Sequence, residues 1–245
     1  MPDLLSSLLQ CTIRSTLDLV LPVYCIGCGR QGEIVCPACV PALVSLEPPF
    51  CDVCADPGVI GVCRDCRSLT SPTYLSGIRS PFLMEGLVRE AVHWFKYRNY
   101  RVAAPCLGSL MASYLAENPL PGDVLVPVPL HSAKLRGRGY NQAELLALEI
   151  GKVTGVPVER KLLSRTRNSA PQVNMAESSR RRANTAGAFK CGEDLAGATC
   201  ILVDDVCTTG STLGACAEAM VAAGAKQVWA LTLARESLEE AWPAN

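Results

Sequence analysis

Eight cysteines, arranged as four C-x-x-C pairs between residues 25 and 66, constrain this chain more than any other feature. Zinc favours four thiolates in a tetrahedron, and one C-x-x-C turn places two sulfurs on the same side of the metal. The segment has few apolar residues, so metal ions rather than a hydrophobic core must order it. Four pairs therefore predict two structural zinc sites, with the ligands Cys25, Cys28, Cys36, Cys39, Cys51, Cys54, Cys63 and Cys66.

The grouping of these cysteines is open from the sequence. The simplest assignment is sequential, with the first four cysteines on one ion and the last four on the other, but an interleaved assignment satisfies the same spacing. Buried or redox-active thiols would be a fair interpretation of one C-x-x-C pair. Four pairs in 42 residues with few apolar partners favour zinc instead.

The cellular compartment bears on how these cysteines are interpreted. A disulfide scaffold would require a secreted protein. The N-terminus has no basic region leading into an apolar run and no evident cleavage site, so a secretory signal is not expected. No window approaches 18 uninterrupted apolar residues, so no membrane span is expected. We therefore expect a cytoplasmic protein.

The overall charge limits the classes of partner. Lys and Arg together number 23, as do Asp and Glu, so the formal net charge is zero. A protein that chiefly coats duplex DNA carries a basic excess, because neutralising phosphates drives that binding. The aromatic content of 5% also weakens a strong role in stacking single-stranded bases.

The chain divides near residue 70 into two expected domains, 1–70 and 71–245. The first would hold an amphipathic helix over 4–20 and the cysteine pairs. In the second, alternating strand and helix patterns predict an α/β fold, a mostly parallel sheet flanked by helices. The expected strands are 74–83, 123–130, 157–163, 199–203 and 227–234, the expected helices are 85–97, 101–116, 140–154 and 211–223, and 164–184 is expected to be a long loop.

The sharpest motif follows the strand at 199–203. Two adjacent acids, Asp204 and Asp205, are followed by Val-Cys and then by a Thr-Thr-Gly-Ser-Thr turn and a helix. Ligands of open α/β sheets bind at this edge, and a helix N-terminus suits a phosphate. The acids would accept hydrogen bonds from a diol or coordinate magnesium. An ordinary capped turn would explain the hydroxyls but not the paired acids. The motif therefore predicts a ribose 5-phosphate site.

Two basic segments accompany this motif. The first, 127–142, follows a strand end and carries three cations and two amides, which suits a diphosphate; taken alone, a solvated basic loop is the better interpretation. The second, 165–184, is rich in arginine, whose forked guanidinium grips phosphate oxygens. Two such segments favour an anionic ligand, and neutralising a diphosphate leaving group would assist its departure.

The run from Ile201 to Thr212 resembles the signature of type I phosphoribosyltransferases, which bind phosphoribosyl diphosphate (PRPP). The resemblance implies that Asp204 and Asp205 contact the ribose hydroxyls. It also implies Mg²⁺ bound with PRPP. The implied 5′-phosphate ligands are Thr208, Thr209, Gly210, Ser211 and Thr212.

Taken together, the cysteine pairs, the 93–98 segment, both basic segments and the acidic motif resemble the ComF family of competence proteins. This resemblance implies a type I phosphoribosyltransferase fold behind a double zinc ribbon. It makes 165–184 a flexible catalytic loop and implies Arg165, Arg167 and Lys96 as catalytic residues, although Lys96 could equally be a surface lysine. The implied pyrophosphate-binding residues are Pro129, Leu130, His131, Arg136, Arg138, Asn141 and Gln142.

Two functions are consistent with this resemblance. One is an enzyme that transfers phosphoribosyl from PRPP to a nitrogen acceptor, which the sequence does not identify, in a role linked to DNA uptake beside an ATP-dependent DNA translocase. The other is a non-catalytic PRPP sensor or adaptor, whose zinc module would engage single-stranded DNA or a protein. The loop arginines favour catalysis, because a sensor would not require them.

Overall fold

The computed structural model describes residues 23–68, 74–98, 100–166 and 187–237. The expected helix over 4–20 lies outside the described residues, as does most of the expected loop, including Arg167. Within the described part of the chain, no helix combines the length and the apolar character needed to cross a membrane.

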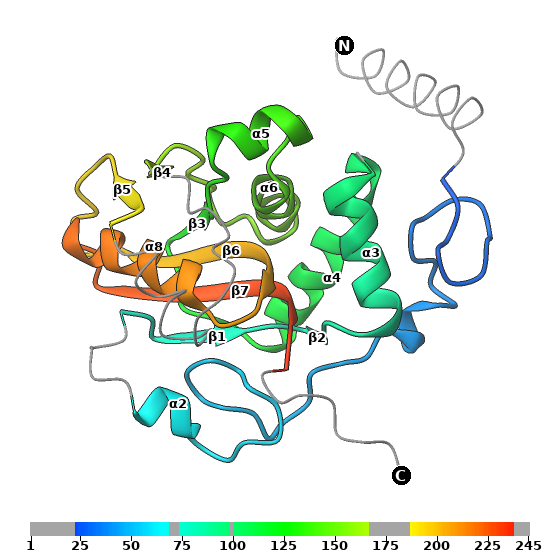
Figure 1. Cartoon of the computed structure of the whole chain (residues 1–245), viewed down its shortest axis with the longest axis horizontal. Helices are drawn as coiled ribbons and strands as arrows, with labels where there is room; N and C mark the ends of the chain where they lie inside the picture. The colour runs from blue at the N-terminus through cyan, green and yellow to red at the C-terminus, as the bar shows by residue number, and fades with distance from the viewer. Residues whose placement is uncertain (1–22, 69–73, 99, 167–186, 238–245) are drawn as a thin grey trace, which may run out of the picture.

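A parallel sheet forms the centre of the molecule (Figure 1). Its strand order is β1-β7-β6-β3, with β2 continuing the β1 edge alongside β7. The longest strands, β6 and β7, pair over their length, with Ile201 opposite Trp229. A separate antiparallel pair, β4 and β5, lies beside the sheet. The strands are β1 (Gly77–Arg79), β2 (Phe82–Leu83), β3 (Val124–Pro127), β4 (Leu163–Arg165), β5 (Phe189–Cys191), β6 (Thr199–Cys207) and β7 (Gln227–Arg235).

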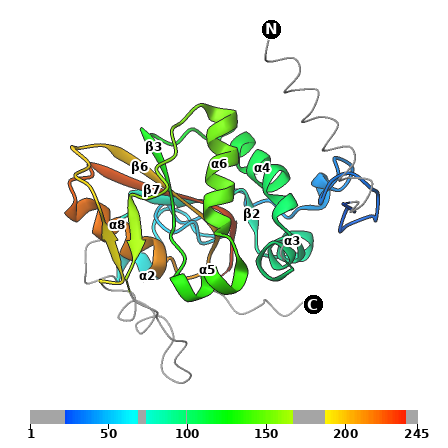
Figure 2. The ribbon, with the colours of Figure 1, turned by 90° about the horizontal axis from the view of Figure 1, so that it is seen from above.

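Helices cover both faces of this sheet (Figures 1 and 2). Successive residues of a strand point to opposite faces, so the almost continuous apolar run of β6 feeds two cores. Ile201 and Val203 pack with α3, α4 and α6, whereas Cys200 and Leu202 pack with α8. The helices are η1 (Val40–Ala42), α2 (Arg64–Arg67), α3 (Gly86–Tyr97), η2 (Arg101–Ala103), α4 (Ala104–Glu117), α5 (Ser132–Arg138), α6 (Gln142–Thr154) and α8 (Ser211–Ala222).

The two cysteine segments pack at different places on this α/β unit. The first lies by α3 and α4: the Cys106 thiol of α4 donates to the Val35 carbonyl at 3.6 Å. The second lies by β1, where the Ile78 amide donates to the Val53 carbonyl at 2.8 Å. In Figure 1 the first segment (blue) stands beyond α3, and the second (cyan, with α2) lies along β1.

Most of the elements expected after residue 74 are confirmed, and four differ. The strand expected over 74–83 is divided into β1 and β2. The segment after Pro129, where no helix was expected, forms the helix α5, which begins at an N-cap formed by His131 and ends at Gly139 in the left-handed conformation. The expected strand 157–163 is only a bridge at Val158, and β4 starts at Leu163. The strand expected over 199–203 runs on to Cys207, because β7 pairs with it throughout.

Candidate functional site

The paired acids lie inside β6, close to its carboxyl end. Asp205 is buried, and its Oδ1 lies 2.9 Å from Nζ of Lys96 on α3. Asp204 is partly exposed, and its Oδ1 accepts a hydrogen bond from the Asp205 amide at 2.8 Å. The sequence predicted that both acids would follow the strand, whereas the structure places them within it. Neighbouring residues of a strand alternate, so the two carboxylates point in different directions.

The pKa of Asp204 is shifted by its surroundings. Its pKa is raised to about 7, first because desolvation disfavours the charged form and then because the Asp205 carboxylate repels it. The positive charges of Lys96 and Arg165 oppose this rise. Asp204 is therefore poised to change its charge near neutral pH.

The phosphate loop, defined as Thr208–Thr212, connects β6 to α8. Gly210 caps the helix at φ +72°, and a Cβ there would lie 3.2 Å from Cδ1 of Ile78, so glycine fits this position on two counts. Oγ1 of Thr209 and Oγ of Ser211 lie 2.8 Å apart. Hydroxyls and the first N–H groups of a twelve-residue helix thus gather at one point, which suits a phosphate dianion.

Three polar residues between β3 and the first turn of α6 hold the backbone in place. His131 accepts a hydrogen bond from the Ala133 amide at 3.2 Å, and Asn141 accepts one from Ala143 at 3.2 Å while donating to the Val128 carbonyl at 3.0 Å. Gln142 is buried, and its Nε2 donates to the Phe95 carbonyl at 3.2 Å. These three side chains, expected to contact a diphosphate, are therefore engaged within the fold.

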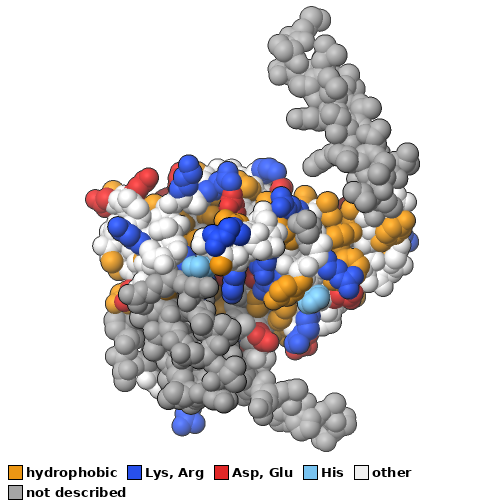
Figure 3. Space-filling model, turned by 45° about the horizontal axis from the view of Figure 1, so that its top comes forward, with side chains coloured by type: hydrophobic (Ala, Val, Ile, Leu, Met, Phe, Trp, Pro, Cys, Tyr) orange, Lys and Arg blue, Asp and Glu red, His pale blue; other side chains and the backbone are white. Residues whose placement is uncertain are grey.

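Cations from three elements converge beside the acids. Arg138 donates to Gln142 Oε1 at 2.6 Å and lies over the Tyr97 ring. Arg165 of β4 lies over the Phe189 ring. The pKa of Lys134 is lowered, first by desolvation and then by the charges of Arg165, Arg138 and Lys96. Figure 3 shows Lys and Arg side chains gathered on the face that carries both histidines of the chain. Of the other expected ligands, Arg136 is exposed, and Pro129 and Leu130 are partly buried.

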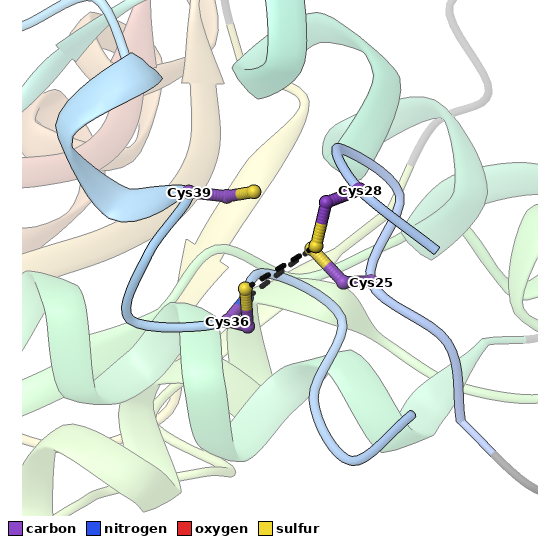
Figure 4. A group of neighbouring side chains, drawn as sticks. All are labelled: Cys25, Cys28, Cys36 and Cys39. Carbon is purple, nitrogen blue, oxygen red and sulfur yellow. Dashed lines mark hydrogen bonds between the residues drawn. The ribbon is translucent and has the colours of Figure 1, made fainter. Parts of the chain in front are cut away.

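The first four-cysteine site consists of Cys25, Cys28, Cys36 and Cys39, whose sulfurs lie within 4.8 Å of one another. Figure 4 shows the four sulfurs pointing toward one another from two turns. Cys28 and Cys36 Sγ are 3.6 Å apart, and tetrahedral zinc with bonds of about 2.3 Å separates its sulfurs by about 3.8 Å. The Cys36 amide donates to Cys25 Sγ, as expected for a thiolate. Donors and spacing fit structural zinc.

The second site, Cys51, Cys54, Cys63 and Cys66, repeats this arrangement. Cys54 and Cys63 Sγ are 3.7 Å apart, and the Cys63 amide donates to Cys51 Sγ at 3.2 Å. The grouping is therefore sequential, and the interleaved alternative is wrong. Four sulfurs at each site leave no open position for water, so the sites suit a structural metal.

Family models match both parts of the chain. The double zinc ribbon domain matches residues 16–67, and the phosphoribosyl transferase domain matches residues 135–241. The competence protein ComFC of Bacillus subtilis is 28% identical over 84% of this chain and 86% of its own length. This chain is similar to the ComF competence proteins over most of its length.

Two further similarities were found. The DNA utilization protein YhgH of Salmonella typhi is 34% identical over 57% of this chain; the match spans 64% of that relative, just under two thirds of its length. Among solved structures, a glutamine PRPP amidotransferase from B. subtilis covers 54% of this chain and 26% of its own, at 20% identity and a TM-score of 0.37.

Lys134, one of the three cations counted in the first basic segment, lies among the converging cations as the diphosphate interpretation expects. One residue beside this site, Arg235, escaped the sequence reasoning. Arg235 is fully buried at the end of β7 and donates hydrogen bonds to the backbone of both Cys54 and Cys207. An arginine that ends an apolar strand was the available signal, because an unpaired cation is seldom buried there.

Proposed function

We propose that this protein binds PRPP with Mg²⁺ and transfers its phosphoribosyl group to a nitrogen acceptor. One observation carries the proposal: paired acids, a phosphate loop and a group of cations share one region at the carboxyl end of β6. PRPP presents a diol, a 5′-phosphate and a diphosphate, and each of these three groups of residues suits one of them. In the reaction the C1–O bond to diphosphate breaks, the C1–N bond forms, and the acceptor nitrogen loses a proton to solvent.

Each group has a distinct task in this proposal. Asp204 and Asp205 accept hydrogen bonds from the ribose hydroxyls, and the phosphate loop binds the 5′-phosphate through its amides and hydroxyls. Lys96, Lys134, Arg138 and Arg165 stabilise the diphosphate as its charge develops, and Mg²⁺ supplies further neutralisation. Arg167 joins them in this proposal, although it lies outside the described residues.

The biological setting is part of the same proposal. Relatives carry the names competence protein ComFC and DNA utilization protein YhgH. We infer a role in handling incoming DNA in the cytoplasm, with single-stranded DNA and an ATP-dependent translocase as partners. The zero net charge indicates that any contact with DNA is local rather than spread over the surface.

Calorimetric titration with PRPP and Mg²⁺ tests the binding step. Asp204→Ala and Asp205→Ala should abolish the binding seen in the wild type. Glu218→Gln removes a charge from the exposed face of α8 and is a matched control that should bind as the wild type does. Unchanged affinity in both aspartate variants would contradict the ribose assignment. A screen of bases and amines for pyrophosphate release then tests the transfer step.

A second function, a PRPP-responsive adaptor, is favoured by one contact. Arg235 connects the second cysteine site to the phosphate loop, as an adaptor that reports nucleotide supply through its zinc ribbon would require. Tight PRPP binding without pyrophosphate release for any acceptor would favour this adaptor over the enzyme.

A further inference from the structure

Arg235 lies between the second four-cysteine site and the phosphate loop, with none of its surface exposed. On the ribbon side, its Nε donates to the Cys54 carbonyl at 2.8 Å, and its Nη2 lies 3.5 Å from Asp56 Oδ1. On the loop side, its Nη1 donates to the carbonyls of Cys207, at 3.3 Å, and of Thr208. One side chain therefore joins two segments that are about 150 residues apart in the chain.

A buried guanidinium tolerates little displacement, because each N–H that loses its acceptor incurs a desolvation cost. The Cys54 carbonyl belongs to one of the four cysteines whose sulfurs can hold a metal ion, and a bound ion would fix its position. The Thr208 carbonyl begins the phosphate loop. A shift of the ribbon around Cys54 must consequently move Arg235, and with it the start of the loop.

Packing provides a second connection between the same two segments. The amide of Ile78 in β1 donates to the Val53 carbonyl, next to Cys54, at 2.8 Å. The other end of this side chain, Cδ1, approaches the α-carbon of Gly210 so closely that a Cβ there would lie 3.2 Å away. The ribbon thus supports the phosphate loop at both its first residue and its glycine.

We propose that the second four-cysteine site positions the phosphate loop through Arg235, so that zinc bound there sets the affinity for a ribose 5-phosphate group. Arg235 is a positioning residue in this proposal, because it acts through backbone carbonyls and contacts no ligand. The first site packs by α3 and α4 instead and is assigned no such role. The inference rests on the proposed PRPP site, and its test separates the two.

Asp56→Ala is the sharpest variant, because it removes the acidic partner of Arg235 while leaving Arg235 and all four cysteines in place. Asp65→Ala removes an exposed acid of α2 from the same ribbon and is its matched control. Arg235→Lys retains the charge but cannot span both sets of carbonyls. Zinc per chain is measured by mass spectrometry and PRPP affinity by calorimetry. We expect two zinc ions in every variant, at least fivefold weaker PRPP binding in Asp56→Ala and Arg235→Lys, and wild-type affinity in Asp65→Ala.

Amide hydrogen exchange tests the coupling without PRPP. We expect at least threefold faster exchange over 207–213 in Asp56→Ala and in zinc-depleted protein, with β3 and the Asp65→Ala control unchanged. Faster exchange in a protein that binds no PRPP would support the coupling and reject the proposed function. Exchange over 207–213 that matches the wild type in Asp56→Ala would overturn the coupling, whatever the PRPP affinity.

Discussion

Nζ of Lys96 lies 2.9 Å from Oδ1 of Asp205, so helix α3 supplies the counter-charge of the buried acid in β6. The lysine side chain is 23% exposed and the acid 9% exposed. The pair connects the ribose end of the candidate site to the helix whose neighbouring residue, Tyr97, contacts Arg138. We therefore expect the binding of a diol at Asp205 to alter the contacts of α3.

Loss of this counter-charge should destabilise the fold. Lys96→Ala leaves a buried carboxylate unpaired, and we expect it to reduce the free energy of unfolding by about 1–3 kcal/mol. The double variant Lys96→Ala/Asp205→Asn should recover most of this loss, because the uncompensated charge is gone. Urea unfolding of the two single variants and the double variant measures the coupling. Additive effects would show that the ion pair contributes nothing.

The raised pKa of Asp204 predicts opposite effects of pH on stability and on binding. A carboxyl with a folded pKa of about 7, above its unfolded value, binds protons more readily in the folded state, so it lowers stability as pH rises from about 4 to 7. Asp204→Asn should therefore raise the melting temperature at pH 8 and change it much less at pH 4. A larger stabilisation at pH 4 than at pH 8 would contradict the assignment.

PRPP binding should depend on pH in the other direction. The ionised Asp204 is the better acceptor for a ribose hydroxyl, so affinity should rise between pH 6 and pH 8. Calorimetry at three pH values, in buffers of different ionisation enthalpy, would detect the proton released on binding. Because the phosphates of the ligand also titrate at about pH 6, the wild type and Asp204→Asn should be compared with the same ligand at each pH. A ratio of their affinities that does not change with pH would count against Asp204.

The phosphate loop should not tolerate a side chain at Gly210. Gly210→Ala forces alanine into the left-handed region and against Ile78. We expect the variant to lose about 1–2 kcal/mol of stability. We also expect it to lose phosphate binding. Gly214→Ala is the matched control, because Gly214 lies in the helix that Gly210 caps and its Cβ would meet open space. It should be neutral or slightly stabilising. Equal behaviour of the two variants in melting and ribose 5-phosphate titration would refute the loop geometry.

Metal analysis should find two zinc ions per chain. Cys28→Ser in the first site and Cys66→Ser in the second should each lower the zinc content toward one, since each serine removes one of four thiolates. If either single variant lowered the zinc occupancy of both sites, the result would contradict the sequential grouping.

The sequence predicted the features that depend on local patterns. The C-x-x-C spacing indicated the zinc ligands, and the apolar run ending in Asp204 and Asp205 indicated the strand, the loop and the helix after it. Long-range contacts explain the remainder. The pairing of β6 with β7 extends the strand through both acids to Cys207, and the buried amide of Gln142 reflects its contact with Phe95, 47 residues earlier. Arg235 likewise acquires its role only where the ribbon and the loop meet.

The most direct test of the central claim is a crystal structure of the protein with PRPP and Mg²⁺. The account predicts the 5′-phosphate against the amides of residues 208–212, the ribose hydroxyls within hydrogen-bond distance of Asp204 and Asp205, and the diphosphate facing Lys134 and Arg165. A ligand bound elsewhere, with the phosphate loop empty at saturating PRPP, would contradict it.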